Sequence, residues 1–274
     1  MKKDKYARFS PQHIAYLKKK QRSDIAVNAG RIGVLVVVIA LWELLAATGA
    51  IDSFITSSPS RIAQTLAELV QDGSLFKHAA VTLMETLAGF FIATIAGTLI
   101  AIGLWWCRPL RRVLEPHLIV LNALPKIALG PIIIIWIGSG YGAIIFMAIL
   151  ICIIITVISV LSGFLQTDKG KLMLLDTMNA TKWQKLTMLV LPANTPTIIA
   201  ALKINVGLSW VGSIMGEYLV SRAGLGYLII YGGQVFDLDL VMTSTIVLCV
   251  LAAAMYALVA VFEKAVNKKF NAKT

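Results

Sequence analysis

The sequence predicts an all-α integral membrane protein with six transmembrane helices and with both ends of the chain in the cytoplasm. Three observations support this: the composition, six long apolar runs, and the distribution of Lys and Arg. Of the 274 residues, 58% are hydrophobic and 14% are charged, whereas soluble domains are about 45–50% apolar and about 25% charged. A water-soluble fold of this length could not bury that excess, so lipid surrounds much of the chain.

The first apolar run covers residues 32–49, is interrupted only by Glu43, and follows a basic segment over 1–31. A basic lead-in of this length is too long for a signal peptide, so we expect this helix to be retained. Each run is close to the roughly 20 residues that a helix needs to cross about 30 Å of hydrocarbon. We expect a transmembrane domain over 32–262 and a cytoplasmic tail over 263–274. The five later runs cover 87–106, 118–137, 143–161, 197–220 and 240–262.

The Lys and Arg residues fix the predicted orientation. The segments 1–31, 107–117, 162–196 and 263–274 carry 9, 3, 4 and 4 of them. The outer loops carry only Arg61, Lys77 and Arg222, as the positive-inside rule requires when both ends are cytoplasmic. The net charge of +11 is therefore a topology signal and a contact with anionic lipid headgroups, not a nucleic-acid footprint.

Two outer loops have recognisable local patterns. Residues 58–60 read Ser-Pro-Ser, and apolar residues then recur at helical spacing through 71. This pattern predicts a capped amphipathic helix on the outer membrane surface. Residues 138–142, with three Gly, predict a tight turn.

The cytoplasmic loop over 162–196 has the most specific sequence. Asp176–Leu191 predicts an amphipathic helix with an exposed Trp183, and Pro192 and Pro196 break the chain before the fifth apolar run. Amphipathicity alone favours a helix that lies on the lipid surface.

The motif residues point to a family. The chain resembles the permeases of bacterial ATP-binding-cassette (ABC) importers, and among them the nitrate/sulfonate/taurine-type subfamily. Their signature loop has a Glu-Ala-Ala stretch, a later Gly and a terminal Leu-Pro. Ala180–Gln184 and Leu191-Pro192 match it, Asn179 stands where the Gly usually sits, and Met173–Leu175 replace Glu-Ala-Ala. The other matching motifs, in order, are Trp42-Glu43, Pro59–Ile62, Leu124–Ala128 with Pro131, Trp136–Gly138 and Gly224–Gly226.

The resemblance implies a type I ABC importer transmembrane domain in the bacterial inner membrane. Two permease subunits, commonly identical, would pair with ABC ATPase subunits and an external substrate-binding protein. It also implies that Asp176–Thr187 is a coupling helix that docks in a cleft of the ATPase. ATP and Mg²⁺ would bind the ATPase, since no G-x-x-x-x-G-K-[ST] occurs in this chain. The coupling residues would be Asp176, Asn179, Ala180, Thr181, Lys182, Trp183 and Gln184.

Polar residues within the predicted membrane helices are candidates for the translocation path, because ionisable groups there are costly. Asn205, Ser209, Ser213 and Glu217 recur every four residues. They predict a pore-lining stripe, with helix–helix contact as the alternative. Lys126, between Pro125 and Pro131 of a kinked helix, could attract an anion, cap freed carbonyls or pair with a carboxylate such as Glu217. Lys203 is expected to snorkel to the cytoplasmic face.

Other chemistry is not indicated. Three His and no carboxylate–His cluster predict neither a metal site nor a catalytic site. Cys107, Cys152 and Cys249 read as small hydrophobic residues. The family resemblance implies import of a small solute, with a sulfonate-, taurine- or nitrate-like anion favoured over bicarbonate, a thiamine-precursor pyrimidine or riboflavin. An ion-coupled secondary transporter is the alternative, although the two halves show no inverted repeat.

Overall fold

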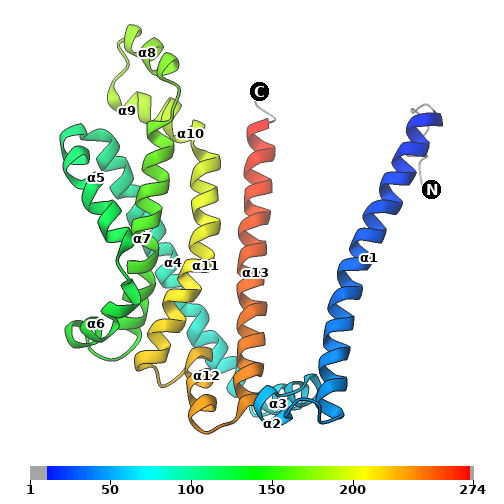
Figure 1. Ribbon diagram of the computed structural model, residues 1–274. Coiled ribbons are helices and arrows are strands. Elements are labelled where there is room, and N and C mark those ends of the chain that lie inside the picture. The colour runs from blue at the N-terminus through cyan, green and yellow to red at the C-terminus, as the bar shows by residue number, and fades with distance from the viewer. Residues whose placement is uncertain (1–10, 272–274) are drawn as a thin grey trace. The chain divides into compact units, whose positions relative to one another are not determined.

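A computed structural model describes residues 11–271 (Figure 1). Contacts divide the chain into two units, residues 1–64 and 65–274, and each is described by itself. Residues 1–10 of the basic segment and 272–274 of the predicted tail lie outside the described residues.

The first unit contains α1 (Pro11–Ala47), α2 (Ser53–Thr56) and the start of α3 (Pro59–Gln71). Helix α1 runs without a break from the basic segment into the first apolar run. Its part Ile25–Ala47 is long and apolar enough to span a membrane. Asp52 caps α2 by accepting the N–H of Phe54 at 2.9 Å. The carboxylate of Glu43 accepts the backbone N–H of Ser60 at 3.0 Å, so this acid in the first span has a local partner. Helix α3 confirms the amphipathic helix expected after residue 58.

The second unit contains four straight helices that are long and apolar enough to span a membrane. A bent pair can supply one more span: α5 (Arg108–Ala123) meets the short η1 (Lys126–Leu129) and α6 (Gly130–Ile137) at 87°. With α1, these elements confirm the predicted all-helical fold with six spans. The bend falls at Leu124-Pro125, where the sequence predicts a kink, but α5 already begins at Arg108, inside the expected cytoplasmic loop. The straight helices are α4 (Ser74–Trp106), α7 (Tyr141–Leu165), α11 (Thr195–Val220) and α13 (Leu238–Asn271).

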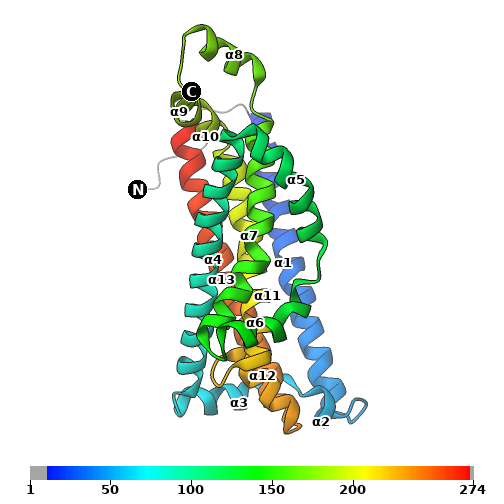
Figure 2. The ribbon, with the colours of Figure 1, turned by 90° about the vertical axis from the view of Figure 1, so that its left-hand side faces the viewer.

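Helix α7 packs closely against both α4 and α11, and Gly residues permit this approach (Figures 1 and 2). A Cβ atom added to Gly89 of α4 would lie 2.5 Å from the Ala148 Cβ. One added to Gly212 of α11 would lie 2.5 Å from the Ala148 Cα. Gly89 of α4 and Gly212 of α11 therefore pack against α7 within one subunit, as small residues do at membrane helix contacts.

Shorter helices occupy the ends of this unit. The outer loop after α11 contains α12 (Leu225–Gln234), which the sequence pattern did not predict. The loop between α7 and α11 contains α8 (Lys169–Thr177), α9 (Lys182–Lys185), the π-helical turn η2 (Leu186–Val190) and α10 (Leu191–Ala193). The single helix expected over Asp176–Leu191 is therefore wrong: the chain breaks at residues 178–181.

Candidate functional site: the cytoplasmic loop and the polar residues of the spans

The second half of the loop is anchored to the helical bundle. Leu186 and Val190 are buried against Phe164 of α7 and Ala201 of α11. The amide of Asn194 donates to the Thr167 hydroxyl and to the Val190 carbonyl, both at 2.8 Å. The π-turn ends at Val190, two residues before Pro192, which has no N–H with which to bond the carbonyl four residues back. This half of the loop is a continuation of the bundle.

The first half of the loop is more exposed, although Leu172 of α8 packs against the cluster that contains Phe164 and Leu186. Helix α8 begins at a cap, where the Asp168 carboxylate accepts the N–H groups of Gly170 and Lys171 at 2.7 and 3.3 Å. Figures 1 and 2 both show α8 beyond α9 and α10, at the end of the unit. No residue of α8 is buried, so its side chains are available to another protein or to lipid.

The turn between α8 and α9 depends on Asn179. This residue has φ of 54°, in the left-handed region, where Gly is unstrained and Asn is tolerated better than other residues. The N–H of Ala180 bonds to the Leu175 carbonyl at 2.9 Å, which closes the end of α8. Asn179 therefore meets the same backbone requirement as the Gly that usually stands at this position in the signature loop.

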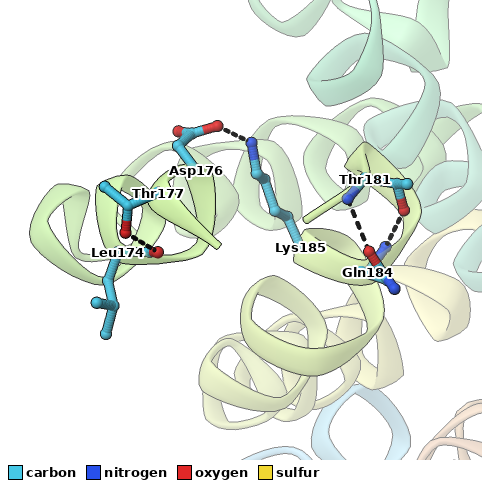
Figure 3. Close-up of polar contacts among 6 residues, drawn as sticks. All are labelled: Leu174, Asp176, Thr177, Thr181, Gln184 and Lys185. Atoms are coloured by element: carbon cyan, nitrogen blue, oxygen red, sulfur yellow. Dashed lines mark hydrogen bonds and ion pairs between the residues drawn. The ribbon is translucent and has the colours of Figure 1, made fainter. Parts of the chain in front are cut away.

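Side chains within the loop hold its two helices together (Figure 3). Thr181 and Gln184 form a capping box: the Thr181 hydroxyl accepts the Gln184 N–H at 3.2 Å, and the Gln184 side chain accepts the Thr181 N–H at 2.8 Å. Asp176 of α8 forms an ion pair with Lys185 of α9. These contacts are intramolecular, so Asp176, Thr181 and Gln184 shape the loop.

Lys182 and Trp183 lie at the cytoplasmic end of α4. The ammonium of Lys182 donates to the Trp106 carbonyl at 3.5 Å, and the Trp183 ring lies 6.4 Å from the Trp106 ring, centroid to centroid. Trp183 is nevertheless 62% exposed. Its indole can contact α4 and still offer a large surface to a partner.

Three loop residues of interest were not among the predicted site residues. Met173, Leu174 and Met178 are 68%, 60% and 70% exposed. We call these three side chains the α8 apolar patch. The sequence did contain a signal for this patch. Met173–Leu175 are apolar although they lie in a cytoplasmic loop, at the position where the family's signature has Glu-Ala-Ala.

The polar stripe of α11 lies inside the subunit. Asn205, Ser209 and Ser213 are fully buried, and the Asn205 amide donates to Thr94 of α4 at 3.0 Å and to Thr156 of α7 at 2.7 Å. This arrangement favours the helix-contact alternative. The pore-lining role of the stripe stays a prediction.

The two lysines within the spans have local partners. The ammonium of Lys126 donates to the Asn122 carbonyl at 3.0 Å, so it caps a carbonyl at the bend between α5 and α6, which was one of the three expected roles. Lys203 forms an ion pair with Glu263 of α13. Glu217, at the far end of the α11 stripe, accepts the backbone N–H groups of Gly226 and Tyr227 at 2.6 and 3.2 Å.

Among residues 11–271, no group of three His, Cys, Asp or Glu could hold a metal ion. An all-helical bundle of apolar spans, with a structured loop at one end, defines the class of multi-pass membrane proteins.

Residues 89–271 match the family described as the binding-protein-dependent transport system inner membrane component, and the chain belongs to this family of ABC-importer permeases. It is 30% identical over 223 residues to an ABC transporter permease of Haemophilus influenzae, covering 80% of this chain and 89% of that protein. It is 26% identical to the aliphatic-sulfonates transport permease SsuC of Bacillus subtilis, covering 86% and 85%. It is also 26% identical to the riboflavin transport permease RibX of Chloroflexus aurantiacus, covering 84% and 86%. The protein is thus a bacterial inner-membrane transport subunit.

Solved structures show the same fold. The MetNI methionine ABC transporter, in an inward-facing crystal form, matches with a TM-score of 0.63 and 20% identity, covering 72% of this chain and 97% of that chain. A bacterial alginate ABC transporter, crystallised with an alginate-bound periplasmic protein, matches with a TM-score of 0.63 and 15% identity, covering 91% and 98%.

Proposed function

We propose that this permease forms the translocation path for a small solute delivered by an external binding protein, and that a separate ATPase docks on the loop over 162–196. ATP and Mg²⁺ bind that ATPase and not this chain. A second permease subunit, an identical copy, completes the path. The shared fold and the family support this arrangement.

The observation that carries the proposal is the form of the loop. Its second half is fixed to α7 and α11. In the first half the α8 apolar patch is exposed, and Trp183 of α9 is 62% exposed although its ring also contacts Trp106 of α4. Exposed apolar side chains of this size mark interaction sites in proteins. A lipid-surface helix would not need the ion pair that joins α8 to α9 or the capping box that starts α9. A rigid, apolar, projecting element is suited to transmitting a movement from a docked partner.

The favoured solute is a sulfonate-, taurine- or nitrate-like anion. The similarity to the aliphatic-sulfonates permease supports this solute. The equal identity to the riboflavin permease supports the alternative solutes, riboflavin and a thiamine-precursor pyrimidine. An ion-coupled secondary transporter is the lesser alternative. Lys126, Asn205, Ser209, Ser213 and Glu217 remain the residues predicted along the path.

A charge placed in the α8 apolar patch tests the docking proposal. Leu174→Glu should abolish co-purification of the ATPase with the tagged full-length chain from its host membranes, because an unpaired charge would be buried at the interface. Gln71→Glu is the matched control: it adds the same charge at an exposed position on the outer helix α3, outside the docking loop, and should retain the ATPase. Normal recovery of the ATPase with Leu174→Glu, at equal permease levels, would show that α8 is not the contact.

A further inference from the structure

Two carboxyl groups from distant parts of the sequence meet in the interior of the bundle. Glu85 of α4 and Glu217 of α11 are each only 2% exposed. They meet at the start of α12, because Thr82, one turn before Glu85, accepts the Leu225 N–H and Glu217 accepts the adjacent Gly226 N–H. Both lie toward the end of the bundle opposite to α8, near the start of α12. Sequence spacing does not predict that these two residues meet, because they are far apart in the chain.

The two carboxyl groups have very different surroundings. Glu217 Oε2 accepts the N–H groups of Gly226 and Tyr227, at 2.6 and 3.2 Å. These are two of the N–H groups that the first turn of a helix leaves unpaired, and the positive end of the helix dipole favours a negative charge there. Both oxygens of Glu85 are buried without a hydrogen-bond partner, as is Glu217 Oε1. Glu217 is therefore in a site for a carboxylate, and Glu85 is not.

No positive charge compensates the pair. Neither acid has an ion-pair partner in the part of the chain that the structure describes. On α4, His78 accepts the Gly224 N–H on its Nδ1 at 2.9 Å, so that nitrogen carries no proton. Helix α7 brings Ile144 against Gly216 of α11, and α13 contributes Leu240 to the cluster around α12. The remaining titratable neighbour is the phenol of Tyr218, the residue after Glu217 on α11. The Tyr227 ring instead stacks on His78.

Two ionised carboxylates in contact, buried and without a cation, would repel each other strongly, so such pairs hold a proton between them. We propose that Glu85 is protonated at neutral pH and donates its O–H to Glu217 Oε1, so that the pair carries one proton and one negative charge. This single bond gives a partner to both oxygens that it joins. Glu85 is a positioning residue: it orients the carboxylate that holds the start of α12 against α4 and α11.

The neighbouring contacts support a positioning role. The Thr82 hydroxyl of α4 accepts the Leu225 N–H at 2.7 Å, one residue before the N–H groups that Glu217 accepts. With the bond from Gly224 to His78, four successive N–H groups at the start of α12 have side-chain acceptors from α4 or α11. An α12 held in this way has a fixed orientation at the outer end of the bundle.

Infrared spectroscopy of the purified full-length chain tests the protonation directly. In a detergent without ester groups, at neutral pH, the wild type should show the carbonyl band of a protonated carboxylic acid, because exposed carboxyl groups are ionised at that pH. Glu85→Gln should lose this band. Glu115→Gln is the matched control, since Glu115 is an exposed acid on α5, and it should keep the band at full intensity. A wild type without the band, or a band that persists in Glu85→Gln, would overturn the proposal.

The positioning role has its own readout. The amide of Gln can replace the donor O–H, so Glu85→Gln should unfold at the wild-type temperature and keep slow hydrogen exchange over residues 222–232. Glu85→Leu has a similar volume but no donor, so it should unfold several degrees lower and exchange faster in the same segment. Equal behaviour of the Gln and Leu variants, or failure of Glu85→Gln to accumulate where Glu115→Gln does, would contradict a donor role. Neither measurement involves the ATPase or the solute, so the outcome is independent of the proposed function.

Discussion

At the scale of the residue, Asn179 decides the shape of the cytoplasmic loop. Its φ of 54° reverses the chain between α8 and α9, and the capping box at Thr181 then starts the next helix. A side chain without a short polar group would be strained in this conformation by about 1–2 kcal/mol. The direction of the chain between α8 and α9 thus depends on the backbone conformation of Asn179.

We therefore expect opposite results from two substitutions at this position. Asn179→Gly should keep the loop and bind the ATPase as the wild type does, whereas Asn179→Val should weaken the loop by about 1–2 kcal/mol or more because a β-branched residue disfavours positive φ. Quantitative pull-down of the ATPase, with limited proteolysis of the loop, measures both effects. Thr177→Val, a β-branched control inside α8, should bind as the wild type does; equal binding by Asn179→Val would contradict a strained turn.

The sequence could identify this loop but not its internal break. The pattern around Trp183 is helical on both sides of Asn179, and periodicity does not reveal a single residue at positive φ. Pro192 and Pro196 did predict the end of the helix. The π-turn before Pro192 is a local change of hydrogen bonding that the spacing of apolar residues does not indicate. The contact between Glu85 and Glu217 is likewise tertiary, and no local pattern predicts it.

At the scale of the element, α11 shows that a regular polar stripe does not identify what it faces. The four-residue spacing of Asn205, Ser209 and Ser213 correctly places these residues on one side of the helix. That side packs against α4 and α7, and Gly212 beside it contacts Ala148. Ile204, Gly207 and Val211 instead lie on a side of α11 that this subunit leaves exposed.

Two Gly→Ala substitutions on α11 distinguish the packed from the exposed side. In Gly212→Ala the new Cβ would lie 2.5 Å from the Ala148 Cα and 3.0 Å from its N. Backbone atoms cannot turn aside, so we expect a loss of about 1–3 kcal/mol. Gly207→Ala has no atom within 4 Å of the new Cβ and should be as stable as the wild type, or more stable by at most about 1 kcal/mol. Thermal unfolding in detergent measures both, and equal midpoints would refute the close contact.

At the scale of the whole molecule, composition and charge determined most of the fold. The six apolar runs correspond to the spans of the structure, because a helix must pair its own backbone groups in lipid. The helix α12 was missed, since ten residues containing several Gly in an outer loop carry no membrane signal. The sequence predicted a kink at this position but not its angle of 87°, because Pro frees backbone groups without fixing the direction in which the chain continues.

The orientation of the molecule is tested by single cysteines, after replacement of Cys107, Cys152 and Cys249. Lys169→Cys on α8 should react with an impermeant thiol reagent only after the inner membrane is made permeable, because the Lys and Arg distribution places this loop inside. Ser139→Cys, in the opposite turn, should react in intact spheroplasts. Strong labelling of Lys169→Cys from outside would reverse the assigned orientation.

The close fit of α7 between α4 and α11 has a consequence for movement. Where a Gly on one helix meets the backbone of the next, as Gly212 and Gly216 meet Ala148 and Ile144, the helices cannot slide without a steric clash. The three helices must then travel as one rigid body whenever the subunit changes shape. Bending is left to places that are not interlocked, as hinges in proteins are. We therefore expect the break at Leu124-Pro125, where α5 and α6 meet at 87°, to be the pivot of such a movement, and Lys126 lies beside it.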